Sequence, residues 1–137
     1  MIRRQFKSTR SSKSMIFLHI IIVTKYRRKV LSSEIPSFVE LEIASIANSM
    51  DIELQEINGE EDHVHMLIKI PPTVPVTAFL HRIKGATSRL VRERFWAEIK
   101  KLLWGDSLWS PSYCVVSAGG ASLDVLKQYI ENQDRPK

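Results

Sequence analysis

Apolar residues in the first half of the chain follow two spacings, one typical of strands and one of helices. Residues 15–23 are apolar and rich in β-branched side chains, which predicts a buried strand. Over 36–49 apolar positions recur at helical spacing, with a proline in what would be the first turn. A second strand is expected over 52–57, and the Asn-Gly pair at 58–59 predicts a hairpin turn into an antiparallel strand that carries His63.

Glycines and prolines divide the second half of the chain into further elements. Gly85 is expected to break a helix, and the glycine pair at 119–120 is expected to form a flexible joint. In chain order we predict a helix over 76–84, a helix over 95–103, short strands over 104–109 and 113–117, and a last helix over 122–133 that stops before a proline. The whole order predicts an α+β domain with one antiparallel sheet and helices covering a face.

Length and charge limit the classes of protein to which the chain can belong. Its 137 residues are expected to form one domain, 1–137, with a basic arm over 1–13 and a C-terminal helix within 121–135. The formal net charge is +5 and no acidic residue precedes Glu34, which indicates a polyanionic partner, although a solvated arm is the alternative.

No membrane segment is expected, because the apolar run near the N-terminus is far shorter than the roughly 20 residues that span a bilayer and lacks a small-residue cleavage site. A lone Cys114 cannot form an internal disulfide, which fits a reducing cytoplasm.

Two pairs of polar residues are the candidates for chemistry. Because side chains alternate across a strand, His63 and His65 face one side while Val64 faces the other. Tyr129 and Gln133 stand four residues apart, which places a phenol and a carboxamide on one face of a helix. Each pattern alone has a plainer interpretation, since most histidine pairs bind no metal and most helical tyrosines are packing residues.

Four stretches of the sequence together resemble the single-tyrosine HUH transposases of the insertion-sequence 200/605 group. They lie in the family's order and span nearly the whole chain, and only Cys114, where an aromatic residue is expected, is a minor deviation. The stretches are VTKYRRKVL at 23–31, DHVHMLIKIPP at 62–72, KGATSR at 84–89 and LWSPSY at 108–113, followed by YIENQ at 129–133.

The resemblance implies a fold, a reaction and a set of roles. It implies a ferredoxin-like or RNA-recognition-like sheet, a homodimer with shared active sites, and cleavage and rejoining of single-stranded DNA that carries hairpins. It also implies that Tyr129 forms a 5′-phosphotyrosine link and that His63, His65 and Gln133 bind Mg²⁺ or Mn²⁺. Two imidazoles favour Mn²⁺ over Mg²⁺, and the absence of a nearby cysteine argues against a closed structural zinc site.

The DNA-binding surface is expected to combine basic residues that contact phosphates with aromatic residues that stack on bases. Its predicted members are Lys25, Arg27, Arg28, Arg82, Lys84, Arg89, Arg92, Trp109 and Tyr113. His19 is expected to be a core histidine rather than a further ligand. Asp62 is expected either to orient His63 or to serve as a hairpin-turn carboxylate.

Two other functions stay open on the sequence. One is a domesticated relative that cleaves repeated chromosomal hairpins and mobilises nothing. The other is a non-catalytic nucleic-acid-binding module, which would carry aromatic residues at the alternate strand positions where this chain has histidines.

Overall fold

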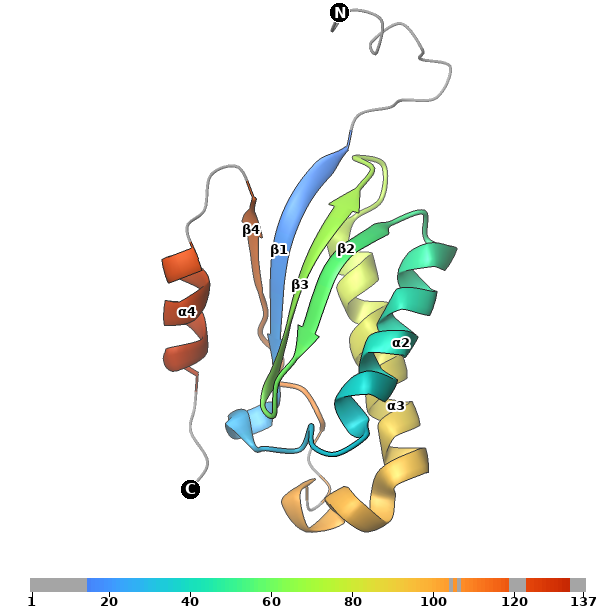
Figure 1. Cartoon of the computed structure of the whole chain (residues 1–137), viewed down its shortest axis with the longest axis vertical. Helices are drawn as coiled ribbons and strands as arrows, with labels where there is room; N and C mark the ends of the chain where they lie inside the picture. The colour runs from blue at the N-terminus through green and yellow to red at the C-terminus, as the bar shows by residue number, and fades with distance from the viewer. Residues whose placement is uncertain (1–14, 104, 106, 119–122, 134–137) are drawn as a thin grey trace, which may run out of the picture.

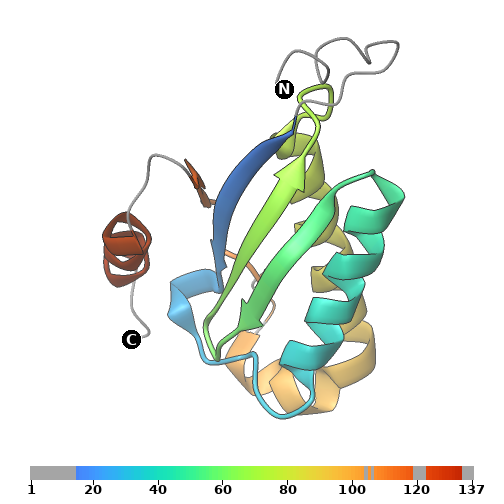
Figure 2. The ribbon, with the colours of Figure 1, turned by 45° about the horizontal axis from the view of Figure 1, so that its top comes forward.

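A four-stranded antiparallel sheet separates two layers of helices (Figures 1 and 2). The computed structural model describes residues 15–103, 105, 107–118 and 123–133. The strand order is β2-β3-β1-β4, where β1 is Ile16–Val23, β2 is Glu53–Gly59, β3 is His63–Ile70 and β4 is Cys114–Ser117. The helices α2 (Ile35–Ser49) and α3 (Val76–Leu103) cover one face, α4 (Leu123–Glu131) lies on the other, and the 3-10 turn η1 (Lys25–Arg27) follows β1. The predicted α+β class with one antiparallel sheet is confirmed.

The main core lies between the sheet and the pair α2 and α3. Alternate residues of β3 are buried, among them Val64 and Met66, both 0% exposed, and they meet Phe79 of α3, also 0% exposed. Burying large apolar side chains of this kind contributes about 1.5–3 kcal/mol each, so this side of the sheet is the rigid framework of the domain.

The opposite face of the sheet carries the histidines. In the β1–β3 register His63 is paired with Val23 and His65 with Ile21, so both imidazoles stand on the face that α4 partly covers. On that face only a small apolar cluster is buried among the described residues, formed by Ile21, Val23 and Leu126 of α4. A site on this face is therefore built on a rigid sheet and completed by a lightly packed helix.

Three predicted boundaries are wrong. Gly85 does not break the helix, because α3 continues through this position, and the backbone leaves helical geometry at Phe95 instead (φ −118°, ψ 21°), where two helical segments meet at a kink. No strand forms over 107–109, where only an isolated bridge joins Trp109 to Thr24. The predicted hairpin between β2 and β3 is confirmed, but its turn lies after the Asn-Gly pair, since Gly59 is the last residue of β2 and the amide of Glu60 donates to the carbonyl oxygen of His63 at 2.8 Å.

Several predicted features lie outside the described residues, namely the basic arm and the glycine pair at 119–120. Among the helices that the structure describes, none has the length and apolar character needed to cross a membrane. The apolar run near the N-terminus is β1, an inner strand of the sheet.

Candidate active site

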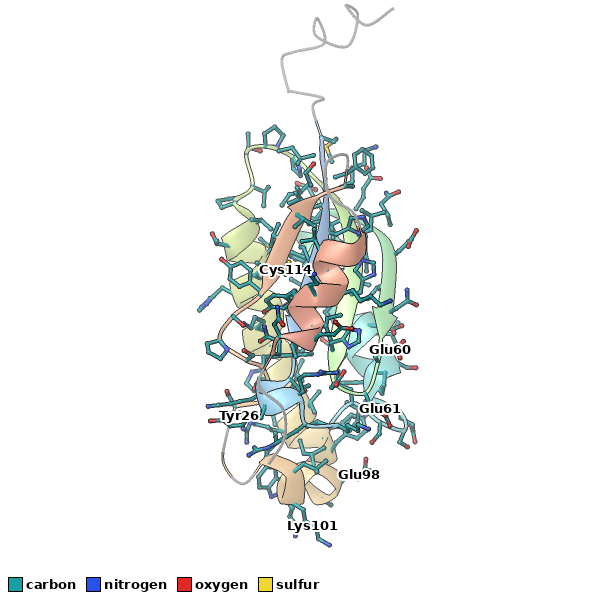
Figure 3. All side chains as sticks on the ribbon, turned by 90° about the vertical axis from the view of Figure 1, so that its left-hand side faces the viewer. Tyr26, Glu60, Glu61, Glu98, Lys101 and Cys114 are labelled. Carbon is teal, nitrogen blue, oxygen red and sulfur yellow. The ribbon has the colours of Figure 1, made fainter. Side chains whose placement is uncertain are left out.

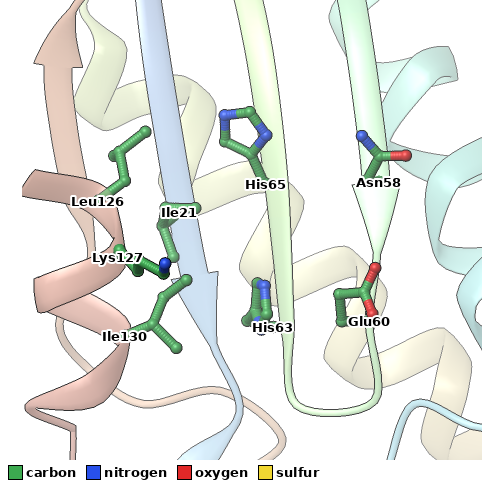
Figure 4. Close-up of a pocket in the computed structure, with 8 residues that line it drawn as sticks. All are labelled: Ile21, Asn58, Glu60, His63, His65, Leu126, Lys127 and Ile130. Atoms are coloured by element: carbon green, nitrogen blue, oxygen red, sulfur yellow. The ribbon is translucent and has the colours of Figure 1, made fainter. Parts of the chain in front are cut away.

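His63 and His65 face a pocket between β3 and α4 (Figure 4). The pocket has a volume of about 450 Å³. Its other lining residues come from β1, β2, the hairpin turn and α4, and they are Ile21, Asn58, Glu60, Leu126, Lys127 and Ile130. Figure 3 shows this face from the side of α4, with Cys114 of β4 beside the helix and Glu60 near the hairpin. The prediction that both imidazoles share one face of a strand is confirmed.

His63 is held by a carboxylate at one ring nitrogen. Its Nδ1 lies 2.9 Å from Oδ1 of Asp62, whose Oδ2 accepts from Nε of Arg27 at 3.1 Å. Burial alone would raise the pKa of Asp62, but the hydrogen bond from His63 and the charge of Arg27 outweigh it and hold that pKa below its ordinary value. Because an ionised carboxylate can only accept, Nδ1 carries the proton and the lone pair of Nε2 is free to bind a metal. Asp62 therefore orients the imidazole, one of its two expected roles.

The backbone that delivers Arg27 is strained. Tyr26 and Arg27 both have left-handed φ values, 57° and 54°, a conformation that costs non-glycine residues about 1–3 kcal/mol each. Thr24, 0% exposed, anchors the turn, since its hydroxyl contacts the carbonyl oxygens of Arg28 and Asp62 at 2.7 and 3.1 Å. Such strain persists only where the surroundings determine the conformation, so the turn fixes the guanidinium on Asp62.

His65 is held at one nitrogen as well, by a second histidine. Its Nε2 lies 3.0 Å from Nδ1 of His19, and the two rings stack with centroids 5.2 Å apart. The expectation of a core histidine at position 19 is wrong, because His19 is only half-buried on the open face of the sheet. Burial, and next the neighbouring His19, lower the pKa of His65, which favours the neutral imidazole that metals bind. When Nε2–H of His65 donates to His19, its Nδ1 lone pair is free.

Tyr129 and Gln133 form a separate polar group with Ser112. The Ser112 hydroxyl donates to Oε1 of Gln133 at 3.2 Å and lies 2.8 Å from the Tyr129 hydroxyl. Since a serine has one proton to give, the phenol donates to Ser112 in this arrangement. Burial raises the pKa of Tyr129, and the hydrogen bond with Ser112 offsets only part of that rise. Ser112 lies within one of the family stretches, LWSPSY at 108–113, but no pattern in the sequence indicated its role.

The structure does not bring the two pairs into one pocket. Neither Tyr129 nor Gln133 lines the pocket of His63 and His65, and Gln133 instead lines a neighbouring pocket of about 380 Å³ beside Lys25. The chain thus presents two half-sites, one with two imidazoles and one with a phenol, a hydroxyl and a carboxamide.

The donor set suits a divalent cation that keeps open coordination positions. His63 and His65 each offer one free ring nitrogen, and Gln133 offers an amide oxygen, so no ligand would neutralise the ion. Among the described residues no group of three or more His, Cys, Asp or Glu side chains is placed to hold a metal ion.

The predicted DNA-binding residues fall into different environments. Tyr113 is 41% exposed, and Arg82 is exposed on α3, so both can reach a ligand. Trp109 is 4% exposed, with its Nε1 donating to the buried Thr87 hydroxyl at 2.9 Å, so its expected stacking on a base is replaced by a place in the core.

The charged members of the predicted set are mostly engaged. Arg27 is paired with Asp62 at 3.1 Å, and Nζ of Lys84 donates to the carbonyl oxygens of Ser110 and Ser112 at 2.7 and 3.3 Å. Arg28 donates to the carbonyl oxygen of Leu103 at 3.4 Å and lies with Lys25 over the Tyr26 ring, while Arg89 pairs with Glu93 and Arg92 lies over Trp96.

Sequence comparisons identify relatives of this chain. The family model described as "Transposase IS200 like" matches residues 12–133. The ISDra2 transposase TnpA of Deinococcus radiodurans is 30% identical over 129 residues, which cover 94% of this chain and 91% of that protein. The transposase for insertion sequence element IS200 of Salmonella typhimurium is 28% identical over 115 residues, covering 84% of this chain and 74% of that protein.

Solved structures give the same result for the fold. A crystal structure of a protein assigned as a transposase in Deinococcus radiodurans superposes with a TM-score of 0.84 at 32% identity, over 95% of this chain and 99% of that one. The REP-associated tyrosine transposase bound to a REP hairpin shares the fold at a TM-score of 0.57 and 10% identity, over 82% of this chain and 61% of that one. Because the family model matches residues 12–133, which include all the described residues, this chain belongs to the IS200-like transposase family.

Proposed function

We propose that this transposase cleaves and rejoins single-stranded DNA at the ends of a mobile element, with Tyr129 as the nucleophile. The phenol oxygen attacks the scissile phosphorus, a bond from Tyr129 to the 5′-phosphate forms, and the bond from phosphorus to the 3′-oxygen breaks. The phenol loses its proton to solvent as this bond forms, and the departing 3′-oxygen takes a proton from solvent, so the step has no net change in protons. The energy of the broken phosphodiester is kept in the phosphotyrosine, so a 3′-hydroxyl of DNA can reverse the step.

His63, His65 and Gln133 would hold Mg²⁺ or Mn²⁺, which polarises a phosphate oxygen and offsets the charge that develops there. Asp62 and His19 keep the two imidazoles in place, each at the nitrogen that does not face the ion. Burial raises the pKa of Tyr129 above its ordinary value of 10, so the resting phenol is neutral near pH 7 and loses its proton in the course of the reaction.

The separation of the two half-sites is the observation that carries the proposal. The histidine pocket lacks a nucleophile, and the group around Tyr129 lacks a cation site, so the two half-sites complement each other. Tyr129 lies on α4, which is only lightly packed on the sheet. We infer a homodimer in which the α4 of one subunit completes the histidine pocket of the other.

Mixing two inactive variants tests this arrangement. One variant replaces His63 and His65 by Ala, the other is Tyr129→Phe, and subunit exchange is verified with differently tagged chains. With sites shared between subunits, each heterodimer has one complete site, so about a quarter of wild-type adduct should form on single-stranded DNA with Mn²⁺. If exchange occurs and no adduct appears, the sites are not shared. If the wild type itself forms no adduct with DNA of its own locus, the proposed reaction fails.

A second function with the same chemistry is cleavage of chromosomal hairpins by a domesticated relative. The likeness in fold to the REP-associated tyrosine transposase favours testing it. Incubating the protein with hairpins from the flanks of its own gene and with repeated hairpins from elsewhere in the genome separates the two, because a transposase should cleave only the former. The non-catalytic module loses support, since histidines and not aromatic residues occupy the open face of β3.

A further inference from the structure

Gly85 is a residue that the fold of this chain does not require. It lies inside the regular part of α3, where glycine destabilises a helix relative to alanine because it fixes a more flexible backbone. Its backbone is not left-handed, and a Cβ built on it would have nothing within 4 Å among the described residues. A Cβ would therefore fit the free protein, so its absence points to something that approaches from outside.

A groove lies directly over this glycine. It has a volume of about 290 Å³ and runs between the N-terminal half of α3 and the loop before β4. Its lining residues are Thr77, Leu80, His81, Lys84, Gly85, Pro111 and Tyr113. Tyr113 is 41% exposed and forms an aromatic wall, while the bare backbone at Gly85 forms part of the floor.

Lys84 keeps the two sides of the groove together. Its ammonium donates to the carbonyl oxygens of Ser110 and Ser112 and lies 5.8 Å from the centroid of the Tyr113 ring. The loop is thereby tied to α3, and the ring is held beside Gly85. Because Ser112 precedes Tyr113 and contacts the Tyr129 hydroxyl at 2.8 Å, the groove adjoins the half-site that carries the nucleophile.

The charge around the groove matches a polyanion. Between Val76 and Arg92 helix α3 contains no acidic residue, and its charged or titratable side chains are those of His81, Arg82, Lys84, Arg89 and Arg92. A flat aromatic ring, a small apolar cavity and surrounding cations are the features with which proteins hold unpaired bases of single-stranded nucleic acid.

We propose that this groove binds one unpaired base of single-stranded DNA, stacked on Tyr113, while the sugar and phosphate of that nucleotide pass over the backbone of Gly85. This rests on the proposed function and adds a subsite to it, because the bound nucleotide would fix the strand on the protein next to the loop that carries Ser112. Gly85 is then kept at a cost in helix stability because a Cβ and any larger side chain would occupy the path of the strand.

Substitutions at Gly85 test the proposal, since they should move stability and DNA binding in opposite directions. Gly85→Ala and Gly85→Leu are compared with Ala97→Leu, a matched change at another exposed position of α3. All are made in the Tyr129→Phe background so that no cleavage interferes, and binding is followed by the fluorescence anisotropy of a labelled single-stranded oligonucleotide from the element end. Gly85→Ala should melt at a higher temperature than the parent, and Gly85→Leu should bind DNA about 10-fold or more weakly. Ala97→Leu should bind as the parent does.

The aromatic wall and the base are tested separately. Tyr113→Ala should weaken binding about 10-fold while Tyr113→Phe keeps it, and a single abasic position in the oligonucleotide should remove the difference between these two variants. Parental affinity in Gly85→Leu, or a difference that survives at every abasic position, would overturn the proposal. Parental affinity together with an altered oligomeric state would assign the groove to a second copy of the chain instead. If the wild type forms no phosphotyrosine but DNA binding still depends on Gly85, the proposed cleavage reaction is refuted while the proposal that this groove binds a base is retained.

Discussion

Replacing Asp62 by Asn should keep His63 in the site but remove the carboxylate that orients its ring. The carboxylate holds Nδ1 of His63 at 2.9 Å and Nε of Arg27 at 3.1 Å, and the side chains of Asp62 and Arg27 are only 13% and 18% exposed. Nη1 of Arg27 is buried and already has no hydrogen-bond partner among the described residues. Asp62→Asn would therefore leave a poorly hydrated cation without its counter-charge and would let the imidazole turn or change tautomer.

The size of the effect follows from the exposure of the pair. Exposed ion pairs contribute about 0.2–1 kcal/mol, whereas breaking a fully buried pair costs about 3–5 kcal/mol, so this intermediate case should cost about 1–3 kcal/mol. Losing an orienting carboxylate behind a ligand histidine typically weakens metal binding about 10–100-fold. Calorimetric titration with Mn²⁺ measures the second effect, and denaturant unfolding in EDTA measures the first.

A double-mutant cycle decides whether the reasoning holds. Arg27→Gln and Asp62→Asn should be coupled by about 0.5–3 kcal/mol in unfolding free energy, and only Asp62→Asn should change Mn²⁺ affinity directly through His63. Because the pKa of Asp62 is lowered in the folded state, its contribution to stability is present above its ordinary pKa of 3.8 and is lost as the pH falls below that value. Additive free energies, or an Mn²⁺ affinity equal to that of the wild type, would refute the assigned role of Asp62.

The remaining predictions concern the ligands and the nucleophile. Tyr129→Phe should abolish the covalent adduct on gels while binding single-stranded DNA within about twofold of the wild type, and an adduct with this variant would assign the nucleophile elsewhere. His63→Ala or His65→Ala should weaken Mn²⁺ binding about 10-fold or more, and undiminished cleavage in EDTA would exclude the metal. His19→Phe, which keeps the stacked ring and removes its nitrogen, should weaken Mn²⁺ binding less than either change, and an unchanged affinity would remove His19 from the site. In a spectrophotometric titration, the phenol signal missing from Tyr129→Phe should appear above pH 10, and Ser112→Ala should move it further up, since the variant has no hydroxyl that can turn to donate to the phenolate.

Local patterns in the sequence predicted the framework and the members of the site. Alternation along 62–70 identified the face of the histidines, and the four-residue spacing of Tyr129 and Gln133 identified a shared helix face, because both periods are fixed by backbone geometry. The predicted helix break at Gly85 failed because local propensity is weak compared with packing. Glycine lowers helix stability by about 1 kcal/mol, which tertiary packing of Phe79, Ile83 and Val91 on α3 easily outweighs.

Contacts between distant segments were beyond the sequence. Pairing of β1 with β3 brings His19, 46 positions away, onto His65, and the strained η1 turn brings Arg27 onto Asp62. Neither arrangement has a local spacing that could signal it. The expected stacking of Trp109 on a base failed in the same way, because no local pattern signals the hydrogen bond from its indole to the buried Thr87 hydroxyl.

The packing of α4 explains why the nucleophile and the histidines can lie apart in one chain. With nine residues, α4 is shorter than the roughly 12–15 residues that an isolated helix needs, so its stability must come from contacts. Among its described side chains only Leu126 is fully buried, against Ile21 and Val23, while Tyr129 is half-buried. Displacing α4 exposes Leu126 together with Ile21 and Val23 beneath it, at a cost of about 1.5–3 kcal/mol for each fully exposed side chain before new contacts form. Contacts with a histidine pocket, a metal ion and a DNA phosphate can exceed that cost, so substrate binding can decide which pocket Tyr129 joins.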